Sequence, residues 1–409
     1  MGYNIILTTY NLILIRYNDE IWLKSKKVKL RMIHTLIDNI KSMLGKANIS
    51  YHKYQMSKDT ARLFFFFNNK DIPSAIDVLK KVFGIYSFSP ALRTSNRIKN
   101  ISERTLELAE NILEKGDSFA LRVKRSGIHD FTSQDVAKQV GQIILDHFKD
   151  LDLKVDLGNP DKKLFIEVRN QFSYIFTDII ENRWKGLPIE HNKKIIVMDI
   201  GRLEDILAGF FMMRRGCIIY PVLFKITDKD GEWEKRIENW KKIFSYTPFS
   251  QFTIIRIDFV KILDIIREKL TEKKYLCALC RFIRFEIISK IIDTQYNIGI
   301  ENSKAITDGL DLNDNNICPE NIDLNSIAYS NNFVNLPIFT PLIGLKLDKI
   351  NNLLKQLSNN LYNSDYCKYK PEKQEFDLKS IIKVYNSLKL KIKDLISKTL
   401  KNQEKIIIR

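Results

Sequence analysis

The stretch Lys194–Phe224 constrains this 409-residue chain most. It reads as an apolar strand (Lys194–Met198), a loop, a helix ending in MMRRG at residues 212–216, and a second apolar strand (Cys217–Phe224). A helix that begins directly after a strand offers free backbone N–H groups and a positive dipole end, which favour an anion such as phosphate. The loop Ile200–Asp205 has one glycine, one arginine and two carboxylates, whereas close approach of phosphate favours several glycines. The order strand, loop, helix, strand therefore indicates a nucleotide site, whereas the composition of the loop argues against one.

Alternation of helices and strands continues beyond this unit. We expect a helix at Glu232–Ile243, a strand at Thr253–Ile257 and a helix at Val260–Leu270. Such alternation predicts a doubly wound, mostly parallel sheet. Ligands then bind at the carboxyl ends of the strands, where the loop Ile200–Asp205 must lie. We assign this α/β domain to residues 194–375 and a basic carboxyl-terminal helix to residues 376–409.

Two smaller α+β regions precede the α/β domain. Residues 1–75 show strands around one apolar-striped helix, and residues 76–180 continue as β-α-β-α-β-β, with a linker at 181–193. The aromatic run Phe64–Phe67 could stack on bases. A strand buried on both faces, or at an interface, explains it better.

Cationic side chains cluster at two places in the second region. The first cluster is Arg93, Arg97 and Lys99, and the second is the strand segment Arg122, Lys124 and Arg125. The formal net charge of the chain is +17, which favours binding of a polyanion. Two alternatives stay open, namely a solvated edge strand and a proteome that is generally rich in lysine.

The five cysteines do not predict a disulfide framework in a chain this long. No apolar run approaches the roughly 18 residues of a membrane span, and the first residues lack the pattern of a secretory signal. We therefore expect no membrane partner and a location in a reducing cytoplasm.

Motifs along the whole chain resemble those of the tRNA 4-thiouridine sulfurtransferase family, in a divergent archaeal-type form. The MMRRG helix end fits the helix that follows the family's PP-loop. Within the loop, Gly201 alone matches the family's residue, and Glu204 stands where the family has an Asp. The other matching segments are Asn159-Pro160-Asp161, Phe165–Arg169, Gly186-Leu187-Pro188, Cys277-Ala278-Leu279-Cys280-Arg281, Ile306-Thr307-Asp308-Gly309, Pro341-Leu342-Ile343-Gly344, Asp348-Lys349-Ile350 and Asp365-Tyr366-Cys367.

The resemblance implies three domains: a ferredoxin-like module, a THUMP RNA-binding domain and a PP-loop α/β domain. It implies tRNA as partner, gripped at the acceptor end, and ATP with Mg²⁺ for activation of uridine at position eight. By resemblance, the nucleotide contacts are Gly201, Arg202, Glu204, Asp205, Phe224 and Arg281. Asp308 stands where the family has a glycine, and Ser326-Ile327-Ala328 lacks the family's glutamine, so several nucleotide contacts are lost together.

Three cysteines carry the sulfur chemistry that the resemblance implies. Cys367 occupies the family's sulfur-handling position, and Cys277 with Cys280 forms its C-x-x-C pair. Three thiolates suit an iron–sulfur cluster with one open iron site. Persulfide chemistry at Cys367, a zinc site completed by Cys318 or a histidine, and plain core thiols are the alternatives. Cys217 lies in an apolar strand and is expected only to pack.

We therefore hold three hypotheses about function. The chain is an ATP-dependent tRNA sulfurtransferase, a catalytically silent tRNA-binding paralogue or partner subunit, or a thiamin-linked sulfur carrier. The sulfur donor is not specified by the sequence, and a homodimer stays open.

Overall fold

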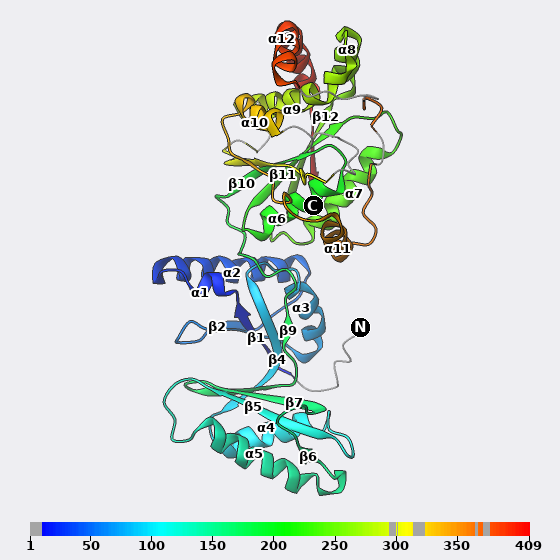
Figure 1. Cartoon of the computed structure of the whole chain (residues 1–409). Helices are drawn as coiled ribbons and strands as arrows, with labels where there is room; N and C mark the ends of the chain where they lie inside the picture. Colours follow the sequence, from blue (N-terminus) through cyan, green and yellow to red (C-terminus); the bar gives the residue numbers. More distant parts are fainter. Residues whose placement is uncertain (1–9, 294–299, 301, 314–323, 365–366, 371–376) are drawn as a thin grey trace. The chain divides into compact units, whose positions relative to one another are not determined.

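A computed structural model describes residues 10–293, 300, 302–313, 324–364, 367–370 and 377–409 (Figure 1). The chain forms two compact units, Met1–Leu187 and Pro188–Arg409. Each is described by itself below. Among the described residues, no helix is both long and apolar enough to cross a membrane.

The first unit is built on one large sheet with the strand order β2-β3-β1-β4-β8-β7-β5-β6, and β9 pairs with β4. Its strands are β1 (Leu12–Tyr17), β2 (Lys53–Met56), β3 (Leu63–Phe66), β4 (Ile85–Ser95), β5 (Ser118–Arg125), β6 (Lys154–Val155), β7 (Lys162–Val168), β8 (Phe172–Phe176) and β9 (Ile180–Glu181). Its helices are α1 (Asp19–Trp22), α2 (Lys26–Lys46), α3 (Ile72–Leu79), α4 (Ile98–Ala109) and α5 (Ser133–His147).

Strand β4 joins the two halves of this unit. Its residues 85–91 pair with β1 and its residues 92–95 pair with β8, both antiparallel. Helices α2 and α3 belong to the first half, and α4 and α5 belong to the second (Figure 1). The start of α5 is fixed by a capping box between Thr132 and Asp135.

The two faces of the sheet differ in what covers them. Apolar side chains of helices α2 to α5 form a large cluster on one face, together with Ile13, Phe65 and Ile166. On the other face, strand residues form a smaller cluster around Phe64 and Tyr174, whose rings stack at 4.3 Å. Residues 64–67 are all buried, so the prediction that this aromatic run is a buried strand is confirmed.

The described residues of the second unit include a six-stranded sheet with the order β14-β13-β10-β11-β12-β15. Its strands are β10 (Lys194–Asp199), β11 (Ile218–Lys225), β12 (Phe252–Asp258), β13 (Ala305–Thr307), β14 (Ile338–Phe339) and β15 (Glu404–Ile408). Its helices are α6 (Leu203–Arg214), α7 (Glu232–Phe244), α8 (Val260–Lys269), α9 (Leu276–Asp293), α10 (Leu324–Tyr329), α11 (Leu347–Leu357) and α12 (Leu378–Lys401).

All strand pairs of this sheet are parallel except the pair of β12 with β15. The predicted fold class, an α/β and α+β chain with a doubly wound parallel sheet after two α+β regions, is therefore confirmed. Strand β15 was not predicted. It follows the basic helix α12 and adds to the edge of the sheet through pairing with β12, which is far away in sequence.

Candidate functional site

A cationic groove lies on the first unit, on the sheet face opposite helices α2 to α5. Its cavity of about 320 Å³ is lined by Arg16, Arg122, Lys124 and Lys163, with Phe165 and Phe176 among its apolar walls. Strand pairing explains why these cations and rings lie together, because residues paired across neighbouring strands point to the same face of a sheet. Arg122 pairs with Phe165, which in turn pairs with Phe176, and Lys124 pairs with Glu167. The groove therefore combines four cations with aromatic rings.

Glu167, which lines this groove, forms ion pairs with three arginines. Its side chain is 4% exposed and lies 2.8 Å from Arg62 Nε, 2.5 Å from Arg169 Nη2 and 3.5 Å from Arg16 Nη2. Burial alone would raise the pKa of Glu167, but the three arginines outweigh it and hold the pKa below its ordinary value. Burial lowers the pKa of Arg16 to about 10, so Arg16 is still cationic at neutral pH.

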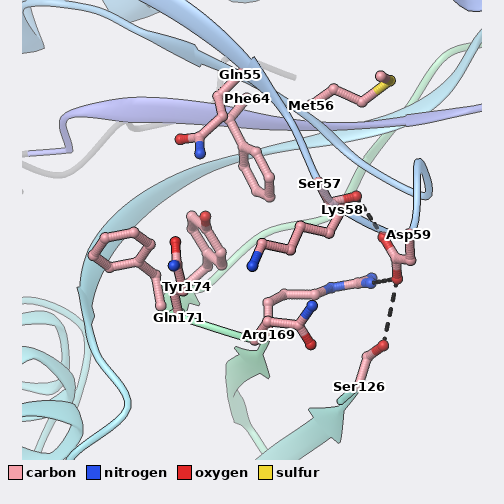
Figure 2. Close-up of a pocket in the computed structure, with 12 residues that line it drawn as sticks. Gln55, Met56, Ser57, Lys58, Asp59, Phe64, Ser126, Arg169, Gln171 and Tyr174 are labelled. Carbon is pink, nitrogen blue, oxygen red and sulfur yellow. Dashed lines mark hydrogen bonds and ion pairs between the residues drawn. The ribbon is translucent and has the colours of Figure 1, made fainter.

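A second, smaller cavity of about 70 Å³ lies on the other side of this network (Figure 2). Arg169 Nη1 donates a hydrogen bond to Asp59 at 2.6 Å, which ties the two halves of the unit together. Figure 2 shows Lys58 reaching over Arg169 toward Tyr174, which stacks on Phe64. The amide groups of Gln55, Asn170 and Gln171 also line the cavity. Amide groups beside aromatic rings are a suitable lining for an unstacked base.

The cations predicted from sequence fall at three places. Arg122 and Lys124 line the groove, and Arg125 is exposed at the end of β5. Arg93 lies on β4, with its guanidinium 4.7 Å above Phe66 and 4.4 Å above Phe172, close to the smaller cavity. Arg97 and Lys99 are exposed at the start of α4, outside both cavities.

Sequence reasoning missed Arg16, Lys163 and the central role of Glu167. Arg16 and Lys163 come from strands far apart in sequence, so only the sheet order brings them together. A signal for Glu167 existed, since a carboxylate inside the apolar strand Phe165–Val168 requires a cationic partner.

In the second unit, the loop between β10 and α6 is closed by its own side chains. Asp205 is fully buried, and its carboxylate accepts hydrogen bonds from the backbone N–H of Ile200 at 3.0 Å and of Gly309 at 3.0 Å. Arg202, which is 2% exposed, donates to the same carboxylate at 2.9 Å. Gly201 has a φ of +101°, the conformation that glycine adopts readily.

A second buried ion pair lies beside the loop. Arg236 of α7 donates to the Asp199 carboxylate at 2.8 Å and to the Phe224 carbonyl at 2.8 Å. Trp240 donates to the other Asp199 oxygen at 2.7 Å. Phe224, predicted as a nucleotide contact, has its ring in the core against Phe259.

A third pair joins Arg281 of α9 to Asp308, with 3.0 Å between Nη2 and Oδ2. Arg281 also donates to the Ser330 hydroxyl at 3.1 Å. Two further carboxyls surround the loop, Glu204 in the first turn of α6 and Glu232 at the start of α7. Burial raises the pKa of both. The predicted nucleotide contacts are therefore brought together, but as an internal network of charges.

The described cysteines all belong to the same unit. Cys277 and Cys280 are in the first turns of α9, and both Cys280 and Cys367 pack against the apolar cluster under α8, α9 and α12. The described residues contain no group of three His, Cys, Asp or Glu side chains placed to hold a metal ion. Cys318, Asp365 and Tyr366 lie outside the described residues. Cys217 is buried, and burial raises the pKa of its thiol to about 11, as expected for a packing role.

Comparison with known families agrees with this architecture. Residues 12–89 match the ThiI ferredoxin-like domain, residues 95–178 the THUMP domain, and residues 193–390 the thiamine biosynthesis protein ThiI. The fold and sites thus define a protein of the THUMP and PP-loop class, with its domains in the predicted order.

Curated relatives make the assignment specific. The chain is 30% identical over 360 residues to a probable tRNA sulfurtransferase of Methanothermobacter thermautotrophicus, covering 86% of each chain. A probable tRNA sulfurtransferase of Methanosarcina mazei is 26% identical over 398 residues, covering 96% of this chain and 94% of the relative. The chain belongs to the tRNA sulfurtransferase (ThiI) family.

Solved structures share the fold. A 4-thiouridine synthetase, crystallised in complex with RNA and ATP, has a TM-score of 0.77 at 20% identity and covers 98% of this chain and 100% of its own. PH1313 from Pyrococcus horikoshii has a TM-score of 0.62 at 23% identity, covering 85% of this chain and 99% of its own.

Proposed function

We propose that this chain is a tRNA-binding protein whose first unit grips the acceptor region of a tRNA. The observation that carries the proposal is the groove in which Arg16, Arg122, Lys124 and Lys163 stand together. Lysine and arginine bind phosphates without reading sequence, and release of counterions supplies affinity. Membership of a tRNA sulfurtransferase family makes tRNA the polyanion to expect.

The smaller cavity adds a place for the single-stranded end of the RNA. Gln55, Asn170 and Gln171 offer donors and acceptors for the edge of a base, and Tyr174 and Phe172 offer apolar ring surface. Arg169 lines this cavity, while Arg16 lines the groove, and both contact Glu167. Glu167, which also lines the groove, therefore positions cations at both cavities.

The test removes charge from the groove and, as a control, from the helix layer. The variant Arg122→Ala/Lys124→Ala/Lys163→Ala should bind tRNA more weakly and lower the slope of log affinity against log salt by about 3, one for each lost phosphate contact. The control Lys115→Ala/Lys138→Ala/Lys149→Ala removes the same charge from exposed positions near or on α5. Equal binding by the two triple variants, measured by filter binding across a salt series, would contradict the groove.

A second candidate function is sulfur transfer by the α/β unit. It is favoured by the placement of Cys280 and Cys367 against one apolar cluster, with Cys277 one turn earlier on the same helix. A three-thiolate cluster site does not follow from the described residues, so the iron–sulfur cluster stays a prediction for iron and labile-sulfide assays on anaerobically purified protein. Thionucleoside analysis of tRNA from cells with and without the gene tests sulfur transfer as a whole.

A further inference from the structure

We propose that the loop between β10 and α6 does not bind ATP, because the Asp205 carboxylate is a built-in anion that occupies the donors a phosphate group would need. The proposal concerns the second unit and is independent of RNA binding by the first. The residues of the loop do not fit a nucleotide, although ATP is expected for a PP-loop family.

The backbone donors of the loop already have partners within the chain. A phosphate at a helix N-terminus is held by backbone N–H groups and a neighbouring cation. Here the N–H groups of Ile200 and Gly309 and the guanidinium of Arg202 all donate to Asp205. The N–H of Gly201 donates to Asp199 at 2.6 Å. These backbone N–H groups and Arg202 Nη2 thus already donate to carboxylates of the chain.

The space beside the loop glycines is filled by the chain itself. Glycine in a phosphate loop usually leaves room for the ligand, but Gly201 is in contact with the chain itself. A Cβ at position 201 would lie 2.8 Å from Ser364 Cβ, and the Ser364 N–H donates to the Gly201 carbonyl at 3.0 Å. A Cβ at Gly309 would lie 2.4 Å from the backbone N of Asp205. Both glycines therefore permit close packing of the protein against its own loop.

The arginines around the loop already have carboxylate partners. Asp199, Asp205 and Asp308 are each paired with one arginine, namely Arg236, Arg202 and Arg281. Glu204 and Glu232 bring further carboxyl groups to the loop. A triphosphate would have to displace buried carboxylates from their arginines, and separating a buried ion pair is strongly unfavourable. A bound polyanion would therefore find each of these arginines already paired with a carboxylate.

The decisive measurement is calorimetric titration of the full chain with Mg-ATP, alone and saturated with tRNA. We expect no saturable binding up to about 1 mM in either case. Micromolar binding in either arm would overturn the proposal. Loss of tRNA binding would affect only the function proposed for the first unit.

A gain-of-binding variant tests the mechanism. Asp205→Ala should release two N–H groups and Arg202, and so bind inorganic pyrophosphate at least about tenfold more tightly than the unmodified chain. Glu204→Ala is the matched control, since it removes the adjacent carboxylate and leaves those donors on Asp205. If Asp205→Ala does not fold, Asp205→Ser replaces it. No gain in the folded Asp205 variant, or an equal gain in the control, would contradict the built-in anion.

Discussion

The two units differ in the ratio of arginines to carboxylates in their buried ion pairs. In the first unit, the carboxylate of Glu167 contacts Arg16, Arg62 and Arg169, Arg169 also contacts Asp59, and Lys124 and Lys163 stand nearby in the groove. In the loop of the second unit, each of three arginines has its own aspartate. Surplus cations can bind an outside anion, whereas matched pairs cannot without being separated. The proportion of charges thus distinguishes the surface proposed to bind RNA from the loop proposed to be closed.

The largest expected effect is on stability when Glu167 is removed. Glu167→Ala leaves three guanidinium groups without their shared carboxylate, so the free energy of unfolding of the first unit should fall by about 3–5 kcal/mol. This loss of unfolding free energy is measured by urea denaturation, with hydrogen exchange of the β7 amides reporting on the first unit. Glu110→Ala, at an exposed position on the helix layer, should change stability by less than about 0.5 kcal/mol. A similar small change at Glu167 would show that the arginines do not depend on it.

A smaller effect is expected for the coupling between Arg202 and Asp205. Each single change, Arg202→Met or Asp205→Ala, leaves a buried partner, while the double change removes both charges. The double variant should therefore lose less stability than the sum of the singles, by about 1–3 kcal/mol. A double-mutant cycle measured by chemical denaturation checks this. Simple additivity would mean that the pair at 2.9 Å contributes nothing specific.

The smallest effect is a difference in response to acid. The folded-state pKa of Glu167 is below its ordinary value of 4.5, so its contribution is present above that pH and is lost as pH falls through the folded pKa. Glu204 and Glu232 have raised folded-state pKa values because of burial, so their contribution is present at low pH and is lost as pH rises. Lowering the pH below 4.5 should weaken β7 more than α6 in hydrogen-exchange experiments. Glu167→Gln should remove this difference between the units.

Most of the fold could be predicted from periodicity, because elements such as β10, α6 and β11 have strong local patterns. Strand β15 could not, since its place depends on pairing with β12 across most of the α/β unit. The site was predicted in part. Arg122 and Lys124 share a strand face by alternation, but Arg16 joins them only through the sheet order. The carboxylates of the loop were noticed in sequence, while the partner that each one contacts depends on tertiary structure.

Strand β4 has a practical consequence for anyone dividing this protein into pieces. The matched family domains end at residue 89 and resume at residue 95, and both positions lie within this one continuous strand. A cut there would leave each fragment with an unpaired strand edge, which promotes aggregation. The ferredoxin-like and THUMP portions are therefore best produced together, as one piece extending to about residue 187.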